Sequence, residues 1–174
     1  MIAIVDAAYG NEASAAAGVV AAGWESGAAI SEFTHRDGPA ADYQPGEFYR
    51  RELPLIVSVL AMLPRKPDIV VIDGYVWLGV EGRKGLGAHL HEALNANSAI
   101  VGIAKTKFKG ASYWAAQVLR GSSQSPVFVT AAGLAIEEAV AGVKRMHGEH
   151  RIPTLAGRAD RLARDALRDA GDMR

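Results

Sequence analysis

The sequence predicts an α/β domain built on a mixed β-sheet that is flanked by helices. The runs of Ile, Val and Ala at 2–5, 69–72 and 100–104 are typical of strands buried on both faces. Two weaker strand segments follow the first run through short, turn-rich connections, which favour an antiparallel meander. The later strands alternate with helical segments. A mixed sheet therefore fits better than a doubly wound one.

Composition bounds the class of protein. Of 174 residues, 49% are hydrophobic and 22% are charged, which is ordinary for a soluble globular chain. The 19 basic residues balance 19 acidic ones, so the strongly basic balance of a non-specific DNA binder is absent. There is no cysteine, secretory signal pattern or apolar stretch long enough to cross a bilayer. We expect a cytoplasmic protein, a monomer with no membrane partner.

The first half of the chain supplies three strands and a helix. We expect strands at 1–6, 14–22 and 28–35, and then a helix over 47–63. Pro54 lies inside that helix, which must either kink there or begin near Glu52.

The second half alternates strands and helices. It is predicted to contain strands at 68–73, 98–104, 112–119 and 126–130, a loop at 74–87, and helices at 87–95, 134–146 and 157–170. There is no repeat or linker, so residues 1–174 form a single predicted domain. The order, with one carboxylate on the first strand and another ending the fourth, resembles ribonuclease-H-like architecture.

Asp6, Glu52 and Asp73 are carboxylates at positions where the local pattern calls for an apolar residue. Asp6 and Asp73 each close a buried-type strand, and Glu52 shares a helical face with Ile56 and Val59. Any one of them alone could bond to loop backbone or lie in an exposed first turn. Since carboxylates are rarely buried without a partner, the three together indicate a site for a divalent cation with oxygen ligands.

Lys105 follows another buried strand and would reach the same edge of the sheet, where it could neutralise a phosphate or a leaving oxygen. A solvated lysine at a strand end is the alternative. Tyr43 lies on a turn-prone loop before Glu52, where it could stack on a base or form only a structural bond. The glycines around the carboxylates indicate a tight pocket for a flat group, or ordinary turns. No dinucleotide or P-loop spacing is present.

Ordered motifs across nearly the whole chain resemble the endonuclease V family. Residues 43–54 (YQPGEFYRRELP) are similar to the family's Y-x-P-G-x-[LF]-x-x-R-E-x-P, and residues 4–9 to its V-D-x-x-Y. Asp73-Gly74 and the blocks 83–90 and 100–105 match in order. Residues 151–153 and 158–162 are similar to its R-x-P and R-x-A-D-R-L.

The resemblance implies a ribonuclease-H-like endonuclease that cuts near inosine in nucleic acid and uses Mg²⁺, or Mn²⁺ as a substitute. By position, Asp6, Glu52 and Asp73 would bind the metal, and Lys105 would contact the phosphate. Tyr43 would lead a wedge between the strands. The pocket for the flipped base would be lined by Gly46, Phe48, Gly74, Gly85, Gly102 and Ala104, and the nucleic-acid backbone would be contacted by Arg83 and Lys84.

The chain also departs from the family pattern. Val76 replaces a glycine, residues 79–83 replace a His-Pro-Arg block, and residues 130–133 lack the histidine of an S-P-G-H block that lies by the family's active site. Two alternatives follow: a homologue that binds nucleic acid without cutting it, and a nuclease whose loop 75–84 recognises something other than inosine. DNA and RNA both remain open as substrates.

Overall fold

The N-terminal half of the sheet is the predicted antiparallel meander. Strand β1 (Ile2–Tyr9) pairs with β2 (Ser14–Ala21), and β2 pairs with β3 (Ser31–Asp37). The computed structural model describes residues 1–40, 47, 49–108 and 113–168.

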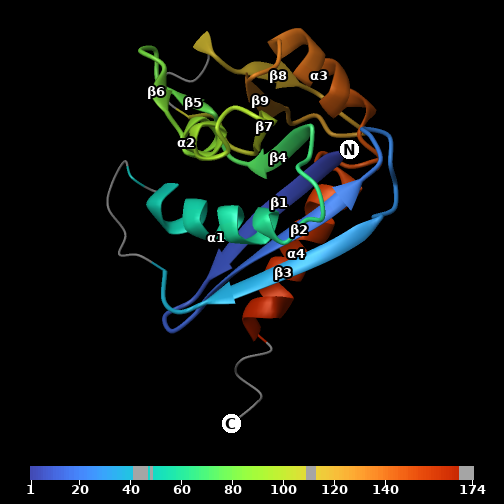
Figure 1. The fold of residues 1–174 in the computed structure, drawn as a ribbon. Helices are drawn as coiled ribbons and strands as arrows, with labels where there is room; N and C mark the ends of the chain where they lie inside the picture. The colour runs from blue at the N-terminus through green and yellow to red at the C-terminus, as the bar shows by residue number, and fades with distance from the viewer. Residues whose placement is uncertain (41–46, 48, 109–112, 169–174) are drawn as a thin grey trace.

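The second half adds four strands and makes the sheet mixed. On its other side β1 pairs in parallel with β4 (Ile69–Asp73), which pairs in parallel with β7 (Ala99–Ala104). The antiparallel strands β9 (Val127–Ala132) and β8 (Ala116–Val118) complete the order β3-β2-β1-β4-β7-β9-β8 (Figure 1).

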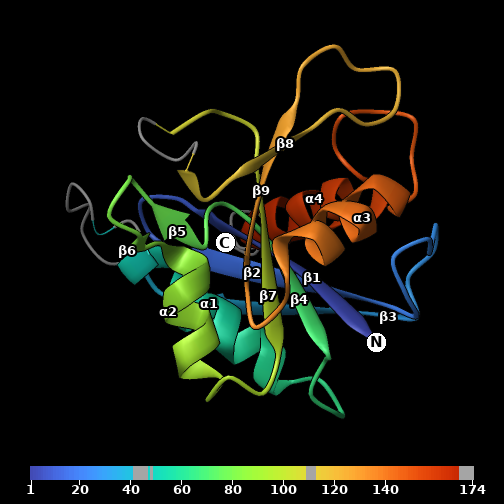
Figure 2. The same cartoon turned by 90° about the horizontal axis from the view of Figure 1, so that it is seen from above.

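Helices cover both faces of this sheet. Figure 2 shows α1 (Tyr49–Ala61) and α2 (Leu86–Ala93) on one side of the strands, and α3 (Ile136–Arg145) and α4 (Thr154–Arg168) on the other. Each pair of helices closes its own hydrophobic core against the sheet. Among the described residues, none of the helices is both long and apolar enough to cross a membrane.

Alternation along each strand assigns side chains to these two cores. In β1, Ala3 and Val5 pack in the α1/α2 core, whereas Ile2 and Ile4 pack in the α3/α4 core. Successive side chains of a strand point to opposite faces, so the parity of a position fixes its face. The parity of a strand position therefore determines which pair of helices its side chain meets.

Besides shifts of a few residues at the ends of other elements, the structure differs from the prediction in β1, in α1 and in the loop 74–87. β1 continues beyond Asp6 to Tyr9, because its pairing with β2 runs four residues past its pairing with β4. Helix α1 does not begin near Glu52 but runs from Tyr49 through Pro54. The predicted loop 74–87 holds the short hairpin β5 (Trp77–Leu78) and β6 (Arg83–Lys84).

The hairpin is held by a residue far along the chain. Trp114 donates from Nε1 to the Val80 carbonyl oxygen at 3.3 Å. Its ring also lies under Gly82, where an added Cβ would be 3.0 Å from Cζ2 of Trp114. No local pattern in residues 74–87 announces this contact, so the hairpin was absent from the prediction.

Arg120 ties the segment 146–151 to the end of β8. This side chain is only 4% exposed. Its guanidinium donates to the carbonyl oxygen of Met146, to that of Gly148 at 3.3 Å and to that of His150 at 2.5 Å. Every one of these acceptors is a backbone oxygen.

Candidate active site

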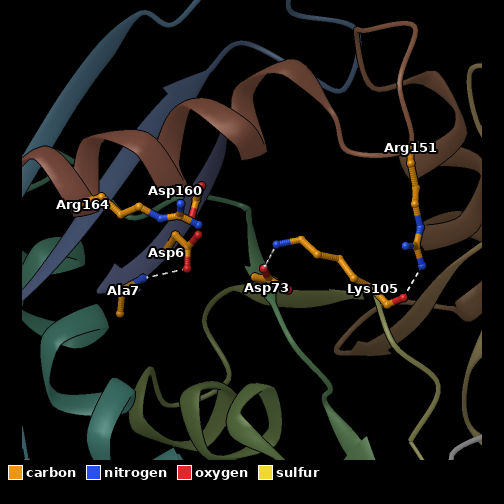
Figure 3. A network of polar contacts seen from close by, with 7 residues as sticks. All are labelled: Asp6, Ala7, Asp73, Lys105, Arg151, Asp160 and Arg164. Atoms are coloured by element: carbon orange, nitrogen blue, oxygen red, sulfur yellow. Dashed lines mark hydrogen bonds and ion pairs between the residues drawn. The ribbon is translucent and has the colours of Figure 1, made fainter. Parts of the chain in front are cut away.

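Strand alternation brings Asp6, Asp73 and Lys105 to one edge of the sheet, on the face that α4 covers (Figure 3). Residues of the same parity, Ile4 and Ile103 among them, pack in the α3/α4 core. In the parallel register Val5 lies opposite Ile72, so Asp6 and Asp73 are the next positions in line. β4 stops there, which opens the sheet beside both carboxylates. The predicted meeting of Asp6, Asp73 and Lys105 is present.

Lys105 forms an ion pair with Asp73, and Arg151 holds the backbone of Lys105 in place. Its Nζ donates to Asp73 Oδ2 at 2.5 Å. Burial opposes the charged amine, but the hydrogen bond and charge of Asp73, helped by Asp6, raise the pKa of Lys105 above its ordinary value. Arg151 donates to the carbonyl oxygens of Lys105 and Pro126, so the end of β7 is anchored (Figure 3). A charged, positioned ammonium group results.

Glu52 reaches the same place from the opposite face of the sheet, on α1. The Tyr9 hydroxyl, at the end of β1, donates to Glu52 Oε1 at 3.4 Å. Burial, and then the charge of Asp6, raise the pKa of Glu52 to about 8 despite this hydrogen bond. The Arg51 guanidinium lies 4.2 Å from the centre of the Tyr9 ring. Tyr9 and Arg51 thus support Glu52, a role that sequence reasoning missed.

Asp6 interacts electrostatically with both of the other carboxylates. Burial, and then the charge of Asp73, raise the pKa of Asp6 to about 7. One hydrogen bond, from the Ala7 backbone N–H to Oδ1 at 2.8 Å, partly offsets these effects. Asp6, Glu52 and Asp73 therefore repel one another when all are ionised, and a bound cation would remove that repulsion.

The donor chemistry fits a hard cation, although the side chains are not gathered around one point. Among the described residues, no three His, Cys, Asp or Glu side chains are arranged to hold an ion as they stand. Lys105 Nζ is hydrogen-bonded to Asp73 Oδ2, and the Tyr9 hydroxyl is hydrogen-bonded to Glu52 Oε1. All three carboxylates supply oxygen ligands, which Mg²⁺ and Mn²⁺ prefer.

The raised pKa values predict that the metal-free protein loses stability as the pH rises. Asp6 and Glu52 titrate near 3.8 and 4.5 when unfolded and near 7 and 8 when folded. Between those limits the folded state binds more protons than the unfolded state, so the free energy of unfolding falls from about pH 4 to about pH 8. Thermal denaturation in EDTA would measure this. Asp6→Asn should flatten the profile; an unchanged slope would contradict the assignment.

Asp160 is a further carboxylate that sequence reasoning quoted only within a motif. It lines a cavity of about 460 Å³, together with Asp6 and Asp73. Its charge contributes to raising the pKa of both Asp6 and Lys105, and Arg164 pairs with it at 2.7 Å. The available signal was its place in an amphipathic helix, next to the inward-facing Ala159.

Two of the glycines predicted to line a base pocket, Gly85 and Gly102, also allow neighbouring backbone segments to come close together. A Cβ atom at Gly102 would lie 2.4 Å from the Gly74 carbonyl oxygen, and one at Gly85 would lie 2.5 Å from that of Tyr75. Ala104 is buried at the end of β7. Close approach of the loop to β7 therefore accounts for Gly102, and close approach between the two ends of the loop accounts for Gly85. The contact of these glycines with a substrate stays a prediction.

The remaining predicted residues lie at the periphery or outside the described part. Arg83 and Lys84 are exposed on β6, and Lys84 pairs with Glu92 at 2.5 Å. Their contact with a nucleic-acid backbone stays a prediction. Three predicted substrate residues fall outside the described residues: Tyr43, Gly46 and Phe48.

Val76 and Gly133, which depart from the family pattern, do not alter the positions of the carboxylates. Val76 is fully buried in the α1/α2 core, where its Cγ2 occupies the space beside Gly87. A side chain at Gly133 would meet His91 and the start of β7. That is the end of β7 opposite to Lys105, so a histidine at Gly133 would not lie by the carboxylates.

The strand order, with paired carboxylates where β1 and β4 part, defines a protein of the ribonuclease-H-like class. The endonuclease V family model matches residues 1–161, and the chain belongs to that family. It is 32% identical to Endonuclease V of Streptomyces coelicolor, over 95% of this chain and 78% of the relative. With Endonuclease V of Streptomyces avermitilis the identity is 31%, over 95% and 80%. The family consists of nucleases, which are hydrolases.

Solved structures share the fold. The crystal structure of Endonuclease V from Streptomyces avermitilis superposes with a TM-score of 0.76 at 26% identity, covering 98% of this chain and 82% of that one. The structure of Ciona intestinalis Endonuclease V superposes with a TM-score of 0.80 at 21% identity, covering 97% of this chain and 86% of that one. It is a complex with a DNA 24mer that contains an inosine followed by a ribo-adenosine. The predicted family and the predicted fold class are both confirmed.

Proposed function

We propose that this protein is a divalent-metal-dependent endonuclease of nucleic-acid repair, acting in the cytoplasm, that hydrolyses a phosphodiester bond near inosine in DNA or RNA. The observation that carries the proposal is the meeting of Asp6 and Asp73 with Lys105 beside one cavity, where β1, β4 and β7 end. Family membership supports nuclease chemistry. The inosine-containing DNA bound by the Ciona relative supports the choice of substrate.

Asp6 and Asp73, joined by Glu52 from α1, would hold Mg²⁺, or Mn²⁺ in its place. When bound, such a cation activates a water molecule and stabilises the leaving oxygen. The coupled carboxylates favour this, because their ionised forms are unstable without a cation. Addition of Mg²⁺ should accordingly restore stability at pH 8.

The chain's own side chains orient and charge the site. Lys105 Nζ, held by Asp73, can transfer to an oxygen of the incoming phosphate as a point charge. The Ala7 N–H fixes Asp6 Oδ1 and leaves Oδ2 for a ligand. Glu52, with a pKa of about 8, holds a proton on its carboxyl group at neutral pH when no cation is bound, and it would release that proton on binding one.

Recognition of the base would fall to the residues predicted to line the substrate pocket. Tyr43 would separate the strands, and the flipped base would lie against Gly46, Phe48, Gly74, Gly85, Gly102 and Ala104. Arg83 and Lys84, exposed on β6, would contact the backbone of a bound strand.

Cleavage of matched oligonucleotides tests the proposal. Labelled DNA and RNA strands that carry either inosine or adenosine at one position would be incubated with Mg²⁺, Mn²⁺ or EDTA. We expect cleavage of the inosine strands with either ion and none in EDTA. Saturable binding without cleavage would instead indicate a binding protein, and cleavage that ignores inosine a nuclease of altered specificity. No binding and no cleavage would refute the proposed function.

A further inference from the structure

The cavity beside the carboxylates extends well beyond them, along α4. It has a volume of about 460 Å³, within the range of small-molecule sites. The ends of β1, β4 and β7 form one wall, and α4 with the residues just before it forms the other. Its lining is charged near Asp6 and Asp73 and apolar around Ile103, Ile152 and Pro153. A ligand with both a charged and an apolar part would suit it.

Gly157 is one of the α4 residues that line this cavity. A glycine inside a helix is about 1 kcal/mol less favourable than alanine. In α3, Gly142 has a packing reason, because its Cβ would lie 2.3 Å from Cε2 of Trp24. At Gly157 an added Cβ would meet nothing within 4 Å. Packing within the protein therefore does not require Gly157, and what its missing side chain provides is room.

Two arginines follow Gly157 along the same wall. Arg161 and Arg164 both line the cavity, and both side chains are exposed. Arg164 is held toward the carboxylates by its 2.7 Å ion pair with Asp160 (Figure 3). Guanidinium groups bind phosphate oxygens in a bidentate manner, so this wall matches a phosphate beside a flat, apolar group.

We propose that this cavity is a nucleotide subsite, which takes the sugar and base adjoining the cleaved bond and holds their phosphate against Arg161 and Arg164. The inference rests on the proposed function and deepens it. Gly102, of the proposed inosine pocket, has the parity of Ile100 and so lies on the α1/α2 face, whereas this cavity lies on the α4 face. The bond to be cut would then lie at the sheet edge between two nucleotide sites.

Filling the cavity tests the proposal. Gly157→Leu would project a side chain into the space, and Gly38→Leu is the matched control, since a Cβ at Gly38 also meets nothing within 4 Å but lies outside the cavity. The probes are deoxyadenosine 5′-monophosphate and inorganic phosphate, titrated by calorimetry. We expect Gly157→Leu to weaken mononucleotide binding on the order of tenfold and to spare phosphate binding. Gly38→Leu should leave both unchanged.

Arg164→Ala provides a second, independent reading. It should weaken the binding of both probes, since the charge that faces the phosphate is lost. Folded Gly157→Leu protein that binds the mononucleotide as wild type does would overturn the subsite. If Gly157→Leu does not fold, unchanged mononucleotide binding by Arg164→Ala would overturn it. Failure of wild type to cut inosine strands, with these binding losses intact, would refute the proposed function and leave the subsite standing.

Discussion

Replacing Asp6 by asparagine is expected to lower the rate of inosine-strand cleavage by about 10³-fold or more at saturating Mg²⁺. The change keeps the shape of the side chain and removes a charge that the cation needs, which is worth several kcal/mol of barrier. Single-turnover cleavage measures it. The same variant should unfold at a higher temperature than wild type at pH 8 in EDTA, because the buried charge is gone.

Asp68→Asn is the matched control for this experiment. Asp68 directly precedes β4, at the end opposite to Asp73, and is exposed. Its replacement should leave both cleavage and the pH profile of stability close to wild type. Equal activity of Asp6→Asn and wild type would remove Asp6 from the catalytic site.

Replacing Gly102 by alanine is expected to destabilise the protein by roughly 2–3 kcal/mol, or roughly 5–10 °C in Tm. The new Cβ would lie 2.4 Å from the Gly74 carbonyl oxygen and 2.8 Å from Thr130 Oγ1, so backbone must move. Thermal denaturation measures the loss.

Gly18→Ala provides the comparison, because Gly18 also lies in a buried inner strand. There a Cβ would make only ordinary contacts of 3.6–3.9 Å with Val59 and Val5. This variant should be as stable as wild type or slightly more so. If Gly18→Ala and Gly102→Ala lost stability equally, the close approach of the loop to β7 would not be the cause.

Much of the fold could be predicted because strand signals in this chain are strong. Continuous apolar runs such as 69–72 indicated inner strands, and short connections indicated the meander. The β5–β6 hairpin could not be predicted, since it depends on Trp114, over thirty residues away. The length of β1 was underestimated for a similar reason, because only pairing with β2 carries it to Tyr9.

The candidate site likewise contains residues that could be predicted from the sequence and residues that could not. Asp6, Asp73 and Lys105 were predictable, because the ends of neighbouring parallel strands meet and parity fixes their face. Asp160 was not singled out, because its meaning depends on where α4 packs, which no local pattern gives. The support of Glu52 by Tyr9 was equally invisible, since it joins the end of β1 to a residue of α1 that is 43 positions away in the sequence.

The hydrogen bonds of Arg120 affect how freely the sequence of the neighbouring segment can change during evolution. A guanidinium that binds only main-chain oxygens imposes a shape on residues 146–150 and almost no side-chain identity. That segment leads directly into Arg151, which anchors the end of β7 at Lys105. Substitutions can therefore accumulate there while the lysine keeps its place, and percent identity understates how much working geometry two relatives share.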